Sequence, residues 1–153
     1  MSVRLLPVLL KRFKRGAKIL DVGCGNGELV TVLNEEGFKA VGFDAYPETQ
    51  DTLAHDINDV PYPFDGEQFD AVIVSCSFRF VDERNTAKVI YELGRVTKKG
   101  GCILIYDTGH LIADRIMTSL PFRYSTWMDF GNTWREKLGL RPFKYSLMVV
   151  EKV

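Results

Sequence analysis

The sequence predicts an α/β protein, a three-layer α/β/α sandwich around a Rossmann-like, mostly parallel sheet. Short apolar segments alternate along the chain with segments of helical periodicity. Residues 69–75 are apolar almost throughout, as expected for a strand buried on both faces of a parallel sheet. Glycines separate the first apolar strand segment from the helix that follows it. In this architecture, ligands bind at the carboxyl ends of the strands, where the strand order reverses.

The first half of the chain supplies two of the helices. Residues 3–15 place apolar side chains at helical spacing, and Pro7 falls in the first turns, where proline is tolerated. Residues 27–36 repeat the helical spacing, and Gly37 closes that helix as its C-cap. Three short segments rich in apolar residues are expected to be strands, the third of them weak: 18–23, 39–44 and 53–57.

The second half repeats the alternation after a loop rich in proline. We expect strands over 69–75 and 102–106, and helices over 83–97, 110–120 and 133–138. Two lysines and the pair Gly100-Gly101 end the helix over 83–97. Residues 122–133 are aromatic and are predicted to be irregular. Residues 140–153 hold either a tight two-strand hairpin or one long strand, and we expect an antiparallel strand at this edge of the sheet.

Length and composition suit a single domain over residues 1–153. The chain has 153 residues, of which 46% are hydrophobic and 26% are charged, which excludes a disordered or fibrous protein. No apolar run is long enough for a membrane span, and the start does not read as a signal peptide. The odd number of cysteines, without metal-like spacing, predicts reduced thiols in a cytoplasmic protein that holds no metal.

Charge is unevenly distributed although the net charge is zero. Residues 1–18 carry +6, residues 19–83 carry −12 and residues 84–153 carry +6. This distribution excludes a uniformly basic surface for nucleic acid. An acidic middle segment would suit a small cationic ligand, although on charge alone a solvated acidic face is the simpler interpretation.

The glycine loop has the wrong spacing for a dinucleotide. Gly23, Gly25 and Gly27 follow the first strand, whereas the dinucleotide fingerprint needs its third glycine one position later, where Glu28 stands. Asp21 and Glu28 also flank the loop, and a pyrophosphate disfavours nearby carboxylates. A nicotinamide-dependent oxidoreductase is therefore the weakest of the functions considered.

Acidic residues stand at the ends of the first three predicted strands. Asp44 follows Gly27 by seventeen residues, and its carboxylate can accept both hydroxyls of a ribose. Asp56 ends the third strand and can accept from the amine of an adenine, while the backbone N–H of Ile57 meets a ring nitrogen. Together with Asp21 they predict one graded site, for the amino-acid end, the ribose and the base of a ligand. His55, one residue before Asp56, is interpreted as structural.

Three segments give the chain its resemblance to a known family. The glycine loop, the stretch over 64–75 and the helix end over 92–101 occur in order and at compatible spacing. Over roughly residues 17–110 the sequence resembles the class I S-adenosylmethionine-dependent methyltransferases, of the small methyltransferase type 11-like kind. It departs from them at Lys99, where a proline commonly stands, and in a short segment between Asp44 and Asp56.

The resemblance implies S-adenosylmethionine as cofactor and assigns its binding residues. The three glycines would line its methionine part and Asp21 would help to hold its amino group. Asp44 would bind the ribose, and Asp56 with Ile57 would bind the adenine. Ser75 and Cys76 would lie beside the sulfonium. The complete implied set is Asp21, Gly23, Cys24, Gly25, Gly27, Asp44, Ala45, Asp56, Ile57, Ser75 and Cys76.

Methyl transfer to an O or N atom needs a base when the acceptor carries a proton. The strand ends offer several candidates, of which Asp107 and His110 after the fifth strand are preferred, with a hydrogen-bonded loop end as the alternative interpretation. The other candidates are Tyr106, Ser75, Cys76 and Arg79. Arg79 would pair either with an anionic substrate or, as the simpler choice, with Asp82. The aromatic residues of 122–134 would either wall a substrate pocket or form core under a loop, and core is favoured.

A second function class stays open. The small size and the lack of a substrate-recognition insert also fit a cofactor-binding subunit that has no catalysis of its own and acts with a partner protein. The sequence shows no nucleic-acid module, and no Asn/Asp-Pro-Pro-aromatic run follows the fourth strand. The acceptor, and whether the chain joins a partner subunit or a homo-oligomer, are left open.

Overall fold

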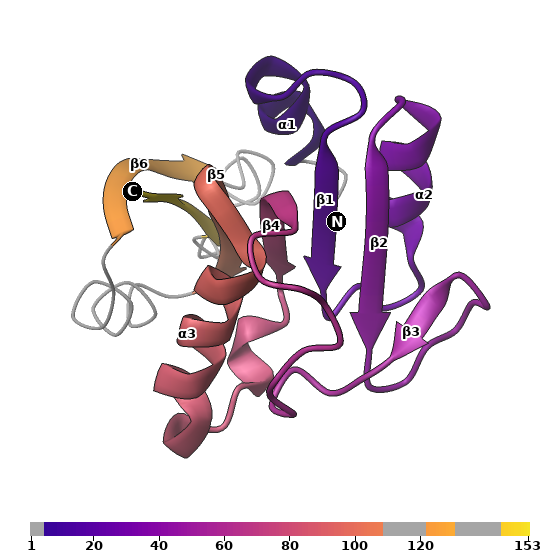
Figure 1. Ribbon diagram of the computed structural model, residues 1–153, viewed down its shortest axis with the longest axis vertical. Coiled ribbons are helices and arrows are strands. Elements are labelled where there is room, and N and C mark those ends of the chain that lie inside the picture. Colours follow the sequence, from indigo (N-terminus) through magenta and orange to yellow (C-terminus); the bar gives the residue numbers. More distant parts are fainter. Residues whose placement is uncertain (1–4, 109–121, 131–144) are drawn as a thin grey trace, which may run out of the picture.

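The computed structural model describes residues 5–108, 122–130 and 145–153 (Figure 1). The described helices are α1 (Leu6–Arg12), α2 (Glu28–Glu35), α3 (Thr86–Val96) and the 3₁₀ turns η2 (Phe78–Phe80) and η3 (Glu83–Asn85). The described strands are β1 (Lys18–Val22), β2 (Lys39–Asp44), β3 (Thr52–Ala54), β4 (Phe69–Ser75), β5 (Thr97–Thr108), β6 (Phe122–Phe130) and β7 (Tyr145–Lys152).

The strands form one mixed sheet in the order β3-β2-β1-β4-β5-β7-β6. The first five strands in this order pair in parallel. β7 then runs antiparallel between β5 and β6, so the predicted antiparallel strand at the C-terminal edge is confirmed. The strand order reverses between β1 and β4, which is the point where open α/β sheets bind ligands.

The period-two alternation of each strand sorts the core into two layers. Leu20 and Val72 pack in the cluster that contains the apolar side of α3. Their neighbours Ile19 and Ile73 point the other way, into the cluster that α1 and α2 cover. Helices therefore cover both faces of the sheet, and the predicted three-layer sandwich is confirmed (Figure 1).

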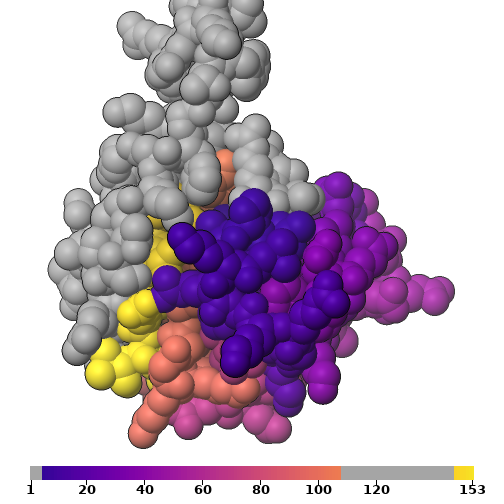
Figure 2. Space-filling model, turned by 90° about the horizontal axis from the view of Figure 1, so that it is seen from above, coloured from indigo at the N-terminus to yellow at the C-terminus, as the bar shows by residue number. Residues whose placement is uncertain are grey.

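The basic N-terminal segment lies at the end of the sheet where the parallel strands begin. Figure 2 shows this segment (indigo) next to the end of β7 (yellow). Arg12 forms an ion pair with Glu151 of β7. Asp70 of β4 accepts hydrogen bonds from the Lys18 backbone N–H and from Lys98 Nζ, each at 2.8 Å. One N-terminal base, Arg12, and the backbone of another, Lys18, are thus engaged with strands of the sheet.

Three predicted boundaries were wrong for local reasons. β3 ends at Ala54: the His55 N–H makes the last hydrogen bond to β2, at the Asp44 carbonyl, and Asp56 then forms a turn with Asn58. α3 ends at Val96, and β5 begins at once. The glycine pair lies inside β5, where a shift in register between Phe69↔Thr97 and Ala71↔Cys102 accommodates the extra residues.

The segment predicted to be irregular contains the strand β6. A register shift between Tyr124 and Thr126 interrupts the alternation of apolar and polar side chains. The two-residue period typical of a strand is therefore not continuous through this segment. Within the described part of the predicted C-terminal segment, residues 145–153, there is one strand, β7, as in the single-strand alternative. The helices predicted over 110–120 and 133–138, and Trp134, lie outside the described residues, as do the side chains of β6.

Candidate cofactor site

A pocket of about 490 Å³ opens at the carboxyl ends of β1, β2 and β4. These are the lower ends of the arrows in Figure 1, beside the point where the strand order reverses. The volume lies in the usual range for pockets that bury a small ligand. Its walls come from the loops after four strands: Gly23, Gly25, Asp44, Ala45, Tyr46, His55, Asp56, Ile57, Asn58, Cys76, Ser77 and Phe80.

The glycine loop brings backbone, without side chains, to this pocket. Gly23 adopts φ +70°, and a Cβ there would stand 2.4 Å from the Cβ of Ser77. The Ser77 hydroxyl donates to the Val22 carbonyl at 2.7 Å, so the loops after β1 and β4 pack directly together. Gly25 has φ +56° and open space where a side chain would begin, which leaves its peptide accessible to a ligand.

Asp44 orders the pocket wall at the end of β2. Its Oδ2 accepts the N–H of Gly25 at 2.9 Å, and its Oδ1 accepts the N–H of Tyr46 at 2.9 Å. The half-buried carboxylate therefore ties the glycine loop to the loop after β2. A carboxylate offers about four lone-pair positions, so each oxygen retains capacity for a ligand hydroxyl.

Asp56 lies in a turn two residues after β3, and the prediction that it ends this strand was wrong. Its Oδ1 accepts the backbone N–H of Asn58 at 2.8 Å and the Asn58 side-chain amide at 3.0 Å. Aspartate favours such turns because its carboxylate can replace the strand ladder as a hydrogen-bond acceptor. The turn carries Asp56 to the pocket that Asp44 also lines.

Asp21 is buried at the end of β1, behind the pocket wall. It is 2% exposed, and its Oδ1 has no hydrogen-bond partner among the described residues. Burial, and then the charge of Asp44, raise the pKa of Asp21 to about 7. Because the described residues offer this buried carboxyl group no cationic partner, the region behind the glycine loop is electrostatically favourable for a positively charged ligand group.

Cys24, predicted to bind the cofactor, does not line the pocket. Its sulfur packs so closely over Gly42 that a Cβ at Gly42 would lie 2.7 Å from it. Burial, followed by the charge of Asp21, raises the pKa of the Cys24 thiol to about 12. The thiol therefore stays protonated at neutral pH and acts as a small packing group.

The end of β4 forms a second polar cluster. Cys76 lines the pocket with a positive φ of 57°, and burial, followed by the charge of Asp107, raises the pKa of its thiol. Arg79 pairs with Asp107, with 2.9 Å between Nη2 and Oδ1, so the predicted pairing of Arg79 with Asp82 was wrong. Asp82 instead pairs with Arg84. His110 lies outside the described residues.

Most of the predicted cofactor residues meet at the pocket. Gly23, Gly25, Asp44, Ala45, Asp56, Ile57 and Cys76 line it, whereas Asp21, Cys24, Gly27 and Ser75 lie outside its lining. Sequence reasoning missed five lining residues, namely Tyr46, His55, Asn58, Ser77 and Phe80. All of these except Phe80 directly adjoin a predicted site residue in the sequence, and this proximity was the available signal.

The donor set fits a nucleoside cofactor that also carries a cationic group. Two carboxylates can accept from hydroxyl and amine groups, a bare glycine loop admits close approach, and Asp21 lies uncompensated behind it. Within the described residues, no group of three or more His, Cys, Asp or Glu side chains is placed to hold a metal ion. The fold and site together define a Rossmann-like protein that binds a nucleoside cofactor.

Comparison with known sequences identifies the family. The profile of the methyltransferase domain family matches residues 20–105, and the chain belongs to this family. S-adenosylmethionine is the cofactor that this membership implies. An uncharacterised methyltransferase of Mycobacterium bovis is 33% identical over 113 residues, which cover 68% of this chain and 43% of the relative. The chain spans 43% to 53% of the length of the mycobacterial, Geobacillus and Synechocystis relatives it matches.

Solved structures confirm the fold. A TehB-like S-adenosylmethionine-dependent methyltransferase of Corynebacterium glutamicum superposes with a TM-score of 0.76 at 20% identity, covering 99% of this chain and 87% of that chain. A chain of the complex between the Haloferax volcanii Trm112 methyltransferase activator and a methyltransferase gives a TM-score of 0.75 at 18% identity, covering 98% and 89%. Among the described residues no helix has the length and apolar character to cross a membrane.

Proposed function

We propose that this chain transfers a methyl group from S-adenosylmethionine to an O or N atom of an acceptor. The observation that carries the proposal is the convergence of Gly25, Asp44 and Asp56 on one pocket at the carboxyl end of the sheet. When bound, S-adenosylmethionine supplies a methyl group that its positive sulfur has already activated. The residues of the chain then have mainly to position the reactants, and positioning alone reaches effective molarities of about 10⁵–10⁸ M.

Each binding residue takes the role that its geometry supports. Asp44 would accept from the ribose hydroxyls while it holds Gly25 and Tyr46 in place. Asp56 and the Ile57 N–H would meet the adenine. Asp21 would favour the amino group by its charge, from a buried position that lies behind the pocket lining.

The catalytic assignment of Asp107 and His110 is part of this proposal. Asp107 is buried at the end of β5 and its carboxylate binds both the backbone N–H and the guanidinium of Arg79. A carboxylate engaged in this way is well placed to hold the chain after β4 in position. To act as a base, Asp107 would have to release Arg79 and take a proton from the acceptor. Arg79 is 43% exposed in its side chain, so such an exchange is sterically accessible.

Replacing Asp44 by alanine is expected to weaken cofactor binding by about 1–3 kcal/mol. The variant leaves ribose hydroxyls unmatched and also releases the N–H of Gly25. Calorimetric titration with S-adenosylhomocysteine measures the loss. Asp51→Ala, an exposed carboxylate in the loop between β2 and β3, is the matched control and should bind as the wild type does. Equal affinity of Asp44→Ala and wild type would contradict the assignment.

A second candidate is a cofactor-binding subunit that acts only with a partner protein. One observation favours it: a structural neighbour occurs in a complex with a methyltransferase activator. Affinity purification that returns one stoichiometric partner, with methyl transfer only in the complex, would favour this candidate. Methyl transfer by the purified chain alone would exclude it.

The predicted compartment and domain organisation complete the proposal. The three cysteines are free thiols, which supports the expectation of a reducing cytoplasm. We also propose that residues 1–153 act as one domain, since the described strands share a single sheet.

A further inference from the structure

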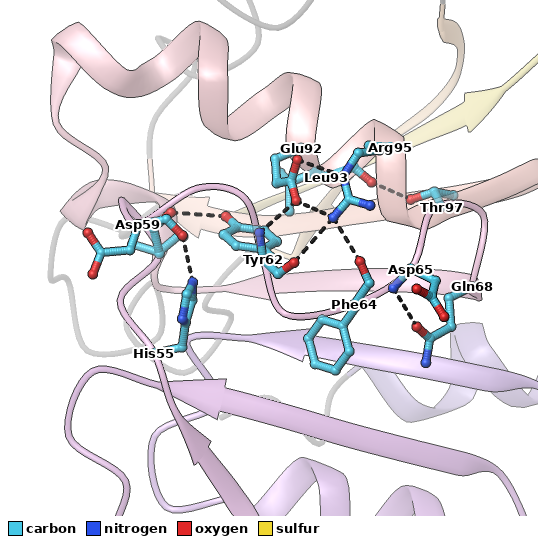
Figure 3. Close-up of polar contacts among 11 residues, drawn as sticks. His55, Asp59, Tyr62, Phe64, Asp65, Gln68, Glu92, Leu93, Arg95 and Thr97 are labelled. Carbon is cyan, nitrogen blue, oxygen red and sulfur yellow. Dashed lines mark hydrogen bonds and ion pairs between the residues drawn. The ribbon is translucent and has the colours of Figure 1, made fainter.

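A partly buried ion pair links α3 to the loop over residues 55–65 (Figure 3). Glu92 and Arg95 stand three residues apart in α3, and their side chains are 5% and 29% exposed. Arg95 Nε donates to Glu92 Oε2 at 2.9 Å. Burial of two charges is costly unless their remaining hydrogen-bonding atoms also find partners.

Those remaining atoms bind the backbone of the loop. Glu92 Oε1 accepts the N–H of Tyr62 at 2.7 Å. Arg95 Nη2 donates to the carbonyl oxygens of Tyr62 at 3.3 Å and of Phe64 at 2.9 Å. The ion pair therefore holds both the N–H and the C=O of Tyr62, as Figure 3 shows. The two motifs that begin at Phe64 and at Glu92 in the sequence meet at this contact.

Tyr62 connects the ion pair to residues 55–58, which line the pocket. Its ring is 2% exposed and packs against Phe43, with 4.8 Å between ring centroids. Its hydroxyl donates to the Ile57 carbonyl at 3.0 Å. His55 stands edge-on to the same ring at 5.8 Å and hydrogen-bonds the Asp59 carbonyl through Nε2 at 2.6 Å.

One peptide unit then connects Tyr62 to the pocket carboxylate. The C=O of Ile57 and the N–H of Asn58 belong to the same planar peptide. Tyr62 holds the oxygen end, and the nitrogen end donates to Asp56 Oδ1 at 2.8 Å. Rotation of this peptide would move the donor that Asp56 accepts, so the buried hydroxyl and the pocket carboxylate are coupled through one rigid plane.

We propose that Tyr62, held by Glu92 and Arg95, is a positioning residue that orients the Asp56 carboxylate toward the base of the nucleoside cofactor. The inference rests on the proposed function, because it concerns the same pocket. Its consequence is specific to the nucleoside part of a ligand: loss of the hydroxyl should weaken any ligand that places its base against Asp56.

The test is Tyr62→Phe, which removes one oxygen and keeps the buried ring. Calorimetric titration with S-adenosylhomocysteine and with 5′-methylthioadenosine should show about three- to tenfold weaker binding of both, the effect of one buried hydrogen bond. Tyr91→Phe, which removes an exposed hydroxyl from α3, is the matched control and should leave both affinities unchanged. Hydrogen exchange should also quicken at the Asn58 amide in Tyr62→Phe, with the amides of β1 unaffected.

A purely structural role of Tyr62 predicts a different pattern. In that case Tyr62→Phe unfolds at lower urea concentration while the folded protein binds both ligands as the wild type does, and the inference is overturned. Glu92→Gln offers an independent variant, because it retains an acceptor for the Tyr62 N–H while it removes the charge that holds Arg95. Its affinity should fall in the same direction, and unchanged affinity would count against the coupling. Failure of the wild type to bind either ligand would overturn the proposed function.

Discussion

Replacing Asp21 by asparagine should raise the free energy of unfolding at pH 8 by about 2–4 kcal/mol relative to the wild type. Near pH 4 the two proteins should be almost equally stable. Burial, followed by the charge of Asp44, raises the pKa of Asp21 from 3.8 to about 7. The folded protein therefore binds this proton more tightly than the unfolded chain does. The resulting stabilisation is complete below pH 4 and is lost as the pH rises through 7. Asparagine resembles the protonated carboxyl group and carries no such pH dependence.

Urea unfolding of both proteins between pH 4 and pH 8 measures this difference. Asp70→Asn is a control of opposite sign. Although burial opposes its ionisation, the hydrogen bonds from Lys98 and from the Lys18 N–H outweigh it and lower the pKa of Asp70. That carboxylate stabilises the fold at neutral pH, and its contribution is lost as the pH falls through its pKa. An Asp21→Asn variant less stable than the wild type at pH 8 would contradict the assignment of an uncompensated buried carboxyl group.

Replacing Arg95 by alanine should lower the free energy of unfolding by about 2–4 kcal/mol, because it strands the buried carboxylate of Glu92. The Glu92 side chain is 5% exposed and would keep only the Tyr62 N–H among its described donors. The carbonyl oxygens of Tyr62 and Phe64 would also lose the donor they share. Urea unfolding at pH 7 measures the loss.

Arg84→Ala is the matched control for this change. Arg84 also pairs with a nearby carboxylate, Asp82, but its side chain is 89% exposed. Exposed pairs gain little because water screens them, so this variant should unfold at the same urea concentration as the wild type. Equal effects of the two substitutions would show that burial does not distinguish the two ion pairs.

The sequence predicted the parts of the site that are local in the chain. The glycines after the first strand and Asp44 at the end of the second could be placed because each follows directly from a strand boundary. The side-chain alternation that divides the core between α3 and the opposite helices was also implicit in the apolar strands.

Features that depend on contacts between distant segments were not predictable in this way. Arg79, just after β4, pairs with Asp107 at the end of the neighbouring strand β5, whereas Asp82 was the nearer partner in sequence. Asp56 left its strand because its own carboxylate forms a turn with Asn58. The strand β6 was not predicted because its register shift interrupts the alternation of apolar and polar residues that indicates a strand.

The most direct test of the central claim is calorimetric titration of the wild-type protein with S-adenosylhomocysteine, with NAD as the comparison ligand. We expect saturable binding of S-adenosylhomocysteine at one site and none of NAD, because Asp44 and Asp56 suit a nucleoside whereas the carboxylates that flank the glycine loop disfavour a pyrophosphate. Binding of NAD at micromolar concentration, or no binding of S-adenosylhomocysteine, would contradict the assignment of this pocket.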